Sequence, residues 1–436
     1  MFTGLIISCF LLVALGGVII INDQTDLFED IMKIKLFIIK IRNFFRQSFI
    51  SRALLYAFLA FLFLRIFSSI VLLIGIIQPN PVAPYSEISQ EILFNLESKN
   101  FFTRYFLAPW YRWDTTHYLE IVDFGYEFDI VNTVWPPMYP FLVKLVNILI
   151  KPSFLAAIVI SNLFSILAFV LLFLYTKEIL DEKTAYRTLG YLIIFPTAFY
   201  FIAGYSESLF LAFSVLVFLF LRRKKWLYAG LVSTLATLTR VQGLLLIIPI
   251  GIELIIELIE TRNLNNFFLH SLSCLFAPFA YGIYSLYVYF CFNAPCPWET
   301  LSIYWEQHFG FPWEGIIAGV SIILGKEIYI DVTPTLVKVL NIVLPLFSVY
   351  LLIRIRKKIS ISLLIYSLTM LLVIMGKIDD NNALVSTIRY IITIFPIFIA
   401  QALIINKKIL TFSIFVISIG LQIILLVYFY WWVWVA

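Results

Sequence analysis

The sequence predicts an all-α polytopic membrane protein. Three observations support this fold class: the composition, the length of the apolar stretches and the positions of the basic residues. Of the 436 residues, 62% are hydrophobic and 13% are charged, against about 25% charged residues in an ordinary soluble domain. A helix needs about 20 residues to cross the hydrocarbon core of a bilayer, and apolar stretches of this order occupy most of the chain. The lipid bilayer is therefore the expected solvent for much of the surface.

The apolar stretches predict about 11–12 transmembrane helices. The first stretch lacks a preceding basic segment and a small-residue cleavage site, so we expect a retained span rather than a signal peptide. The stretches between residues 187 and 259 are short for a bilayer, so local thinning or a re-entrant pair is an alternative there. The predicted spans lie near residues 2–21, 53–77, 153–175, 187–203, 205–221, 226–240, 243–259, 267–292, 334–353, 360–376, 389–405 and 409–431.

Basic clusters between the spans predict which loops face the cytoplasm, because lysine and arginine are enriched in short cytoplasmic loops. An even number of predicted spans separates the three clusters, so all three can lie on one side. Residues 33–52 mix basic and apolar side chains and predict an amphipathic interfacial helix on that side. Residues 1–52 thus form a span plus this basic helix, and residues 53–436 form the transmembrane domain. The clusters are Arg222–Lys225, Arg354–Lys358 and Lys407–Lys408.

Two large loops of the transmembrane domain should face the non-cytoplasmic side: a catalytic loop over residues 78–152 and an aromatic-rich loop over residues 292–331. The first ends in a helix-like piece near residues 138–150. We expect this piece to lie in the interface or to be re-entrant, because a crossing here would place Arg222–Lys225 outside. The tryptophans of the second loop suit a surface at headgroup level or a sugar platform.

Several function classes are excluded by the composition. The net charge of +5 could suggest a nucleic-acid partner, but the basic residues cluster between spans and not along one face, so we expect none. No stretch has the glycine-rich phosphate loop of a nucleotide-sugar-binding domain. Cys291 and Cys296 could pair in an oxidising compartment, although free thiols are favoured. No paired acidic motif indicates a divalent metal, so we predict no metal ion.

Polar chemistry gathers around Asp114, within the stretch from Tyr111 to Leu119. A carboxylate at the membrane surface can accept the proton of a sugar hydroxyl as that oxygen attacks. The alternative is an N-cap, since Asp114 is followed by two threonines. His117 and His308 both belong to the outer loops, and two histidines are too few to predict a metal site.

Three further charged residues project to the same outer face. Glu207, in the Tyr205–Ser208 segment at the start of a span, is expected to face a polar cavity or to be an acid favoured by the helix dipole. Arg240 and Arg389 lie at outward ends of spans. Each could hold a phosphate with two hydrogen bonds or extend to the interface as an isolated cation.

The order of these segments resembles the PIG-V-like mannosyltransferases, which comprise the second GPI mannosyltransferase and its prokaryotic relatives. The resemblance covers roughly residues 53–405, about four fifths of the chain, with two departures: the extra N-terminal span with its basic helix, and the proline pair after Trp135. The matching segments are Arg112-Trp113-Asp114, Gly125-Tyr126, Pro136-Pro137, Tyr205-Ser206-Glu207-Ser208, Arg240 to Gly243, and Arg389-Tyr390.

The resemblance implies a GT-C type glycosyltransferase with interfacial helices in its first outer loop. Such an enzyme takes a sugar from a polyprenyl or dolichyl phosphate, without a further cofactor, and passes it with inversion to a glycan, lipid or protein acceptor. Asp114 would be the general base, and Arg240 and Arg389 would hold the donor phosphate. The other residues expected to bind substrate are Arg112, Trp113, His117, Tyr126, Tyr205, Glu207, His308 and Tyr390.

The resemblance also implies an integral membrane protein, in a prokaryotic plasma membrane or in the ER membrane of a eukaryote, with its active site on the non-cytoplasmic face. A multi-span transporter is the main alternative, since intramembrane charges and broken helices also line substrate pathways. A flippase or ligase of lipid-linked glycans is a third interpretation. The polar residues collect at one face and the sequence has no evident inverted repeat, which favours the transferase.

Overall fold

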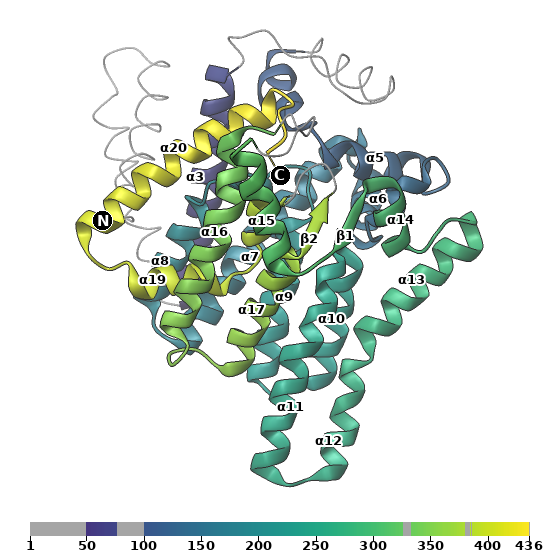
Figure 1. Cartoon of the computed structure of the whole chain (residues 1–436), viewed down its shortest axis with the longest axis vertical. Coiled ribbons are helices and arrows are strands. Elements are labelled where there is room, and N and C mark those ends of the chain that lie inside the picture. Colours follow the sequence, from purple (N-terminus) through teal and green to yellow (C-terminus); the bar gives the residue numbers. More distant parts are fainter. Residues whose placement is uncertain (1–48, 76–99, 326–332, 380–383, 385, 436) are drawn as a thin grey trace, which may run out of the picture.

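The computed structural model describes residues 49–75, 100–325, 333–379, 384 and 386–435, and it is almost entirely helical (Figure 1). The predicted span at residues 2–21, most of the basic helix at 33–52 and the first part of the outer loop at 78–152 lie outside the described residues. The all-α polytopic fold predicted from the sequence is confirmed.

Six helical segments of the described chain are long and apolar enough to cross a membrane. This number is smaller than the predicted total because several other apolar helices are shorter than 18 residues. Helices α11 and α12 form a hairpin that projects at the bottom of Figure 1. The six segments are α3 (Phe49–Gly75), α7 (Ser153–Ile179), η5–α11 (Val241–Leu246 and Ile247–Thr261), α12–η6–α13 (Leu264–Ser271, Leu272–Cys274 and Phe276–Phe292), α16 (Thr335–Ile355) and α20 (Lys408–Tyr430).

Shorter elements complete the bundle and its outer loops. Within the bundle they are α8 (Glu182–Ile193), η4 (Ala198–Phe201), α9 (Glu207–Arg222), α10 (Trp226–Thr239), α17 (Ile361–Met375), α18 (Thr387–Ile391) and α19 (Pro396–Ile404). In the outer loops they are η1 (Thr103–Leu107), η2 (Ala108–Trp110), α5 (Asp114–Phe124), η3 (Ile130–Val134), α6 (Met138–Asn147), α14 (Pro297–Trp305) and α15 (Pro312–Ile323).

Two predicted spans, 187–203 and 389–405, are not continuous helices. Helix α8 ends at Ile193, ahead of Pro196, and α18 is separated from α19 by a break before Pro396. Proline lacks an amide hydrogen and disfavours helical backbone in the residue before it, so both predicted spans are interrupted for a local reason. The first break leaves Tyr205 in non-helical backbone, and the second leaves Arg389 in the short helix α18.

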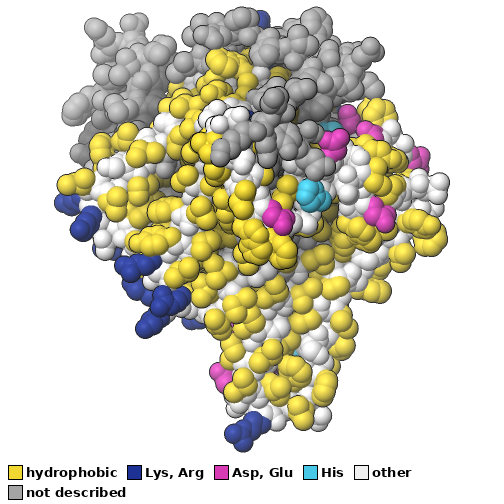
Figure 2. All heavy atoms as spheres, viewed as in Figure 1, with side chains coloured by type: hydrophobic (Ala, Val, Ile, Leu, Met, Phe, Trp, Pro, Cys, Tyr) yellow, Lys and Arg dark blue, Asp and Glu magenta, His cyan; other side chains and the backbone are white. Residues whose placement is uncertain are grey.

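Ion pairs connect the basic ends of neighbouring helices. Arg52 of α3 and Lys177 of α7 both bind Glu182 of α8, at 3.1 and 3.4 Å, and Arg222 of α9 binds Glu178 of α7 at 3.0 Å. Figure 2 shows Lys and Arg side chains along the lower left edge and at the bottom tip, and Asp, Glu and His side chains at the upper right. This separation of charge agrees with the predicted topology, in which the basic end is cytoplasmic.

A short antiparallel sheet joins the second outer loop to the end of α17. Strand β1 (Gln307–Phe309) pairs with β2 (Lys377–Asp379), and Phe309 lies opposite Lys377. The two chain segments also lie close together next to the paired residues, at Gly310 and Gly376. A Cβ atom added to Gly376 would lie 2.7 Å from the carbonyl oxygen of Gly310. This close approach requires glycine, and it places Lys377 beside α18.

Candidate active site

Asp114 is the first residue of α5, and its side chain does not cap that helix. Trp113 occupies the N-cap position without a side-chain hydrogen bond. The Asp114 carboxylate instead accepts a hydrogen bond through Oδ2 from Nη2 of Arg389, at 2.7 Å. The Asp114 amide donates to the Tyr205 hydroxyl at 3.2 Å. The N-cap alternative for this side chain is therefore wrong, because a stronger charged partner arrives from α18.

The Asp114–Arg389 pair is part of a chain of four alternating charges. Arg389 also lies 3.0 Å from Glu207, measured from Nε to Oε1, and Arg240 Nη1 donates to the same Oε1 at 2.6 Å. The exposed fraction of the side chain is 12% for Asp114, 4% for Arg389, 0% for Glu207 and 9% for Arg240. Charges this deeply buried need partners of opposite sign. Neither arginine is an isolated cation that reaches the interface, so that alternative is wrong for both.

Polar neighbours extend the charged chain into the first outer loop. Arg240 Nη1 donates to the hydroxyl of Ser206 at 3.2 Å, and that hydroxyl lies 2.7 Å from the Tyr118 hydroxyl. The Tyr205 hydroxyl donates to the carbonyl of Arg112 at 3.2 Å. The segment Tyr205–Glu207 thus connects α9 to the start of α5. Tyr118 and Ser206 were not predicted as site residues, although Ser206 lies within the matching segment Tyr205–Ser208 and Tyr118 within the polar stretch around Asp114.

One oxygen of each carboxylate has no donor within the described part of the chain. Arg389 occupies Oδ2 of Asp114, while no residue donates to Oδ1. Oε2 of Glu207 is buried and likewise has no hydrogen-bond donor there. Burial raises the pKa of the Asp114 carboxyl, but the adjacent Arg389 guanidinium outweighs burial, so the pKa lies below its ordinary value. Asp114 is therefore ionised at neutral pH, with one oxygen able to accept a proton.

Tyr390 lies among three cations. Its ring centroid is 4.9 Å from the guanidinium carbon of Arg240 and 5.3 Å from that of Arg389. Lys377 Nζ is 5.3 Å from the ring and donates to the hydroxyl at 3.2 Å. Burial raises the pKa of the Tyr390 hydroxyl, but the three cations lower it by more, to about 8.

Lys377 adds the one cation of this cluster that has no carboxylate partner among the described residues. Among the described residues, Asp114 and Glu207 supply two negative charges and Arg240, Arg389 and Lys377 supply three positive charges, so this described set has one more positive than negative charge. Lys377 was not predicted. Its signal in the sequence is the same as that of the two arginines, a basic residue at the outward end of an apolar span.

An aromatic group lies one helical turn beyond Asp114. The imidazole of His117 stacks on Trp135 at 4.4 Å and meets the edge of Trp305, from α14, at 5.6 Å. His117 Nδ1 lies 2.9 Å from Oδ1 of Asn132, whose Nδ2 donates to Glu120 at 3.0 Å. The two outer loops therefore meet at His117, which joins α5 to the aromatic-rich loop.

Three residues predicted to bind substrate lie elsewhere. Arg112 is fully buried and donates to the backbone carbonyls of Tyr430, at 3.0 Å, and Ala108, at 3.1 Å, so its guanidinium has no surface to offer a ligand. Tyr126 is buried and donates to the Trp135 carbonyl at 2.6 Å. His308 is exposed on β1, outside the charged cluster. Arg112 and Tyr126 therefore have structural roles, because each side chain donates hydrogen bonds to backbone carbonyls of the fold.

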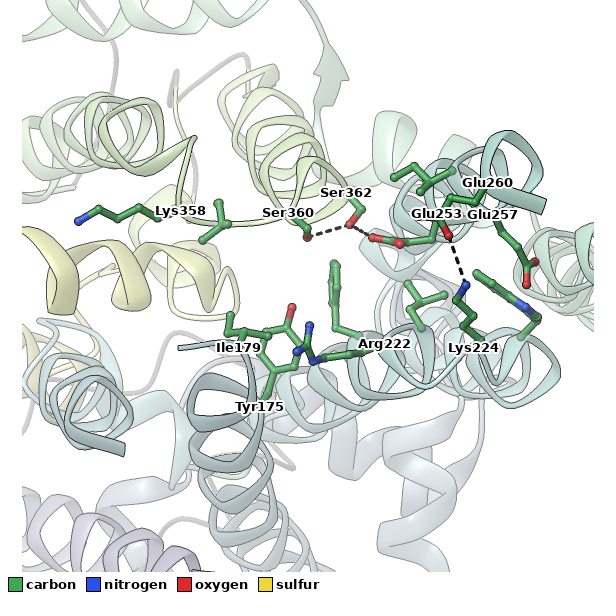
Figure 3. Close-up of a pocket in the computed structure, with 15 residues that line it drawn as sticks. Tyr175, Ile179, Arg222, Lys224, Glu253, Glu257, Glu260, Lys358, Ser360 and Ser362 are labelled. Atoms are coloured by element: carbon green, nitrogen blue, oxygen red, sulfur yellow. Dashed lines mark hydrogen bonds and ion pairs between the residues drawn. The ribbon is translucent and has the colours of Figure 1, made fainter. Parts of the chain in front are cut away.

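A cavity of about 320 Å³ lies at the basic end of the bundle and not at the Asp114 cluster (Figure 3). It is lined on one side by Arg222 and Lys224 and on another by Glu253, and Ser362 donates to that glutamate. Its charges are largely paired, as in the 3.4 Å contact between Lys224 and Glu260. The geometry of the charged cluster, and not the size of a cavity, identifies the candidate site.

No metal centre is found in the parts of the chain that the structure describes, since no three His, Cys, Asp or Glu side chains are grouped to hold an ion. Cys274, Cys291 and Cys296 are free thiols. The favoured interpretation of Cys291 and Cys296 as unpaired residues agrees with this geometry. The independence of the reaction from metal stays a prediction.

Comparison with known proteins supports the resemblance. Residues 134–283 match the family described as dolichyl-phosphate-mannose-protein mannosyltransferase. Over 214 residues the chain is 31% identical to GPI mannosyltransferase 2 of Schizosaccharomyces pombe (strain 972 / ATCC 24843), and the alignment spans a little under half of each protein, 45%. The family match includes Glu207 and Arg240 but neither Asp114 nor Arg389. Over part of its length the chain is thus related in sequence to mannosyltransferases of the GT-C type, and its fold is that of an all-α polytopic membrane protein.

Proposed function

We propose that this protein is an integral membrane mannosyltransferase that moves a sugar from a polyprenyl or dolichyl phosphate to a hydroxyl of a glycan, lipid or protein acceptor, with inversion. One observation carries the proposal. The Asp114 carboxylate is held through Oδ2 by Arg389 at 2.7 Å, while its Oδ1 accepts no hydrogen bond from the described residues. A base needs this combination of a fixed position and an available oxygen. The reaction takes place on the non-cytoplasmic face of a prokaryotic plasma membrane, or on that face of the ER membrane in a eukaryote.

The proposed chemistry is a single displacement. The acceptor hydroxyl donates a hydrogen bond to Oδ1 of Asp114 and attacks the anomeric carbon from the face opposite the phosphate. The new C–O bond forms as the bond to the phosphate oxygen breaks, and its electron pair leaves with the lipid phosphate. The hydroxyl proton passes to Oδ1, and the single attack inverts the anomeric configuration. Because the pKa of Asp114 is low, we expect proton transfer late in the step, when the attacking oxygen has become acidic.

The phosphate contact is assigned to Lys377, with the Tyr390 hydroxyl as a second donor. Arg240 and Arg389 were expected in this role, but both guanidinium groups already bind carboxylates. A phosphate that bound them directly would have to compete with Asp114 and Glu207. Lys377 carries the surplus positive charge of the cluster, and it points to Tyr390 at the same outer end. The arginines then fix the carboxylates and add to the positive potential.

Glu207 is assigned to a substrate hydroxyl. Its buried Oε2 lacks a donor in the described chain, and an unsatisfied buried acceptor costs about 1–3 kcal/mol. A sugar hydroxyl would satisfy this oxygen without disturbing the ion pairs at Oε1. His117, Trp135 and Trp305 add an aromatic surface beside the base, of a kind that packs on the apolar face of a sugar ring.

The choice of mannose and of a lipid-phosphate donor draws on the comparisons. The family description names dolichyl phosphate mannose, and the S. pombe relative is named a GPI mannosyltransferase. The acceptor of the yeast protein is not carried over, because a prokaryotic chain would need another glycan, lipid or protein as acceptor. The position of the charged cluster suits a lipid-linked donor, because such a donor partitions into the leaflet beside the outer ends of these helices.

The test is sugar transfer by the purified protein. Wild-type protein, given radiolabelled mannose on a polyprenyl phosphate and a membrane extract as acceptor, is expected to yield a labelled product whose identification names the acceptor. Asp114→Asn should lower turnover by at least about 100-fold, since general base catalysis contributes about 100- to 10,000-fold. Asp123→Asn is the matched control, because Asp123 lies on the same helix and, within the described part of the chain, hydrogen-bonds to Ser153 at 2.7 Å and not to the charged cluster. Turnover by Asp114→Asn equal to that of the control would remove Asp114 as the base.

A further inference from the structure

The segment that follows α20 packs against the residues that lead into Asp114. The Trp113 ring contacts the rings of Trp432, at 5.5 Å, and Trp434, at 4.8 Å and nearly perpendicular. Arg112 Nε donates to the carbonyl of Tyr430 at 3.0 Å. The Arg112 guanidinium carbon lies 4.9 Å from the Tyr430 ring and 5.0 Å from the Trp432 ring. Residues 430–434, named the tryptophan segment below, therefore enclose the backbone on the N-terminal side of α5.

The enclosed backbone is strained. Trp113 has φ 54° and ψ −128°, a conformation that glycine adopts freely and that other residues rarely adopt. Such a conformation is unfavourable and persists only where surrounding contacts hold it. Trp113 directly precedes Asp114, so its φ and ψ set the direction in which α5 begins. Relaxation of Trp113 would rotate the Asp114 carboxylate away from Arg389.

Among the described residues, the tryptophan segment supplies the ring contacts that could hold Trp113. Within α5 itself, Thr116 donates to the Trp113 carbonyl at 2.8 Å, which fixes the carbonyl but not the indole ring. The rings of Trp432 and Trp434 both contact the indole. Aromatic contacts of this geometry are favourable beyond the apolar area they bury, so they oppose relaxation of the strained backbone.

We propose that the tryptophan segment positions the base of the transferase, a role that rests on the proposed function of Asp114. Trp432 and Trp434 hold the Trp113 ring, and Tyr430 holds the Arg112 guanidinium. Together these contacts keep the Asp114 carboxylate on Arg389 with Oδ1 directed to the acceptor. Trp434 and Arg112 are positioning residues in this scheme and do not contact substrate. Arg112 therefore contributes to the site by holding the backbone before Asp114 in place, and not by contacting a ligand.

The test compares three variants of the full-length protein. Trp434→Ala removes one ring from Trp113, and Trp434→Phe keeps a ring there. Trp431→Ala is the matched control, since Trp431 packs on the same core, whereas the described ring contacts of Trp113 are with Trp432 and Trp434. A displacement of about 1 Å in a reacting group can cost about 100-fold in rate. We expect Trp434→Ala to lower kcat by about this factor, with the donor and acceptor KM nearly unchanged, whereas Trp434→Phe and Trp431→Ala retain most of the wild-type rate.

A second readout separates positioning from general destabilisation. If the carboxylate moves off Arg389, the pKa of Asp114 rises, and the acid limb of the kcat profile should shift to higher pH in Trp434→Ala alone. Trp434→Leu, which keeps apolar volume without a ring, should show the same shift if the alanine variant folds poorly. Equal losses in Trp434→Ala and Trp431→Ala, or an unshifted pH profile, would overturn the positioning role. An inactive wild-type protein would instead overturn the proposed function.

Discussion

The Arg389 guanidinium donates to the Asp114 carboxylate across 2.7 Å, although 275 residues separate the two in the chain. This contact joins α18 to α5 and places the charge of the proposed base. It also extends to Glu207, because Arg389 lies 3.0 Å from that second carboxylate. The reactivity of Asp114 therefore depends on residues in the last third of the chain.

Arg389→Lys should change the pH dependence of transfer. Lysine keeps one positive charge but cannot bind two carboxylates as the planar guanidinium does. The pKa of Asp114, below its ordinary 3.8 in the wild-type protein, should rise, so activity should begin to fall at a higher pH as the medium is acidified. The ion pair also stabilises the fold above the ordinary pKa, and this contribution is lost as the pH falls through the lowered folded-state pKa. Profiles of kcat/KM and thermal unfolding from about pH 2 to 8 measure both effects, and an identical acid limb in the two proteins would contradict the pairing.

Glu207→Gln should destabilise the protein strongly. Glu207 Oε1 lies between the guanidinium groups of Arg240 and Arg389, and loss of its charge leaves two buried cations facing each other. Removal of one partner from a buried ion pair costs about 3–5 kcal/mol. Glu178→Gln is the control, since Glu178 forms an exposed pair with Arg222 worth about 0–1 kcal/mol. Thermal unfolding in detergent compares the two, and equal melting temperatures would show that the buried network does not stabilise the fold.

Lys377→Met should weaken the use of donor. A hydrogen bond to a charged group contributes about 1.5–3 kcal/mol, so we expect the donor KM to rise by about 10-fold or more while the acceptor KM stays the same. Lys144→Met is the matched control, because Lys144 is an exposed lysine of α6 at the same outer end. A donor KM that responds equally to both substitutions would assign the effect to general surface charge and not to a phosphate contact.

Tyr390→Phe should remove an alkaline dependence of donor binding. The pKa of Tyr390 is about 8, so its hydroxyl is neutral below this pH and ionised above it. The phenolate would neutralise part of the positive charge from Lys377 and the arginines and would compete with the donor phosphate. The wild-type donor KM should therefore rise as the pH passes 8, and in Tyr390→Phe it should stay level from pH 7 to 9. A rise of the same size in both proteins would show that another group titrates.

Cysteine labelling can test the topology in a variant without native cysteines. Thr115, beside the base, is fully buried and unsuitable for a labelled cysteine. Glu127 and Lys224 are both exposed, at opposite ends of the bundle. An impermeant thiol reagent applied from outside should modify Glu127→Cys and should reach Lys224→Cys only after the membrane is permeabilised. The reverse pattern would place Asp114 on the cytoplasmic side.

The fold class was predictable because it follows from local properties of the sequence. Apolar stretches about as long as a bilayer is thick predict helices wherever they occur, as α3, α7, α16 and α20 show. Asp114, Glu207, Arg240 and Arg389 could be named from the sequence for a similar reason. A charge in or beside an apolar span is costly unless a local function or partner compensates it.

Tertiary structure decided how these charges are paired. Nothing near Arg389 in the sequence indicates Asp114 as its partner, and only the β1–β2 pairing brings Lys377 to Tyr390. Arg112, next to Asp114 in the chain, is turned to the Tyr430 carbonyl instead of a ligand. An ion pair depends on distances of a few ångströms between distant segments, whereas hydrophobicity acts on each segment separately. The sequence therefore determined which residues carry charge into the membrane, and the packing of the helices determined which of those charges meet.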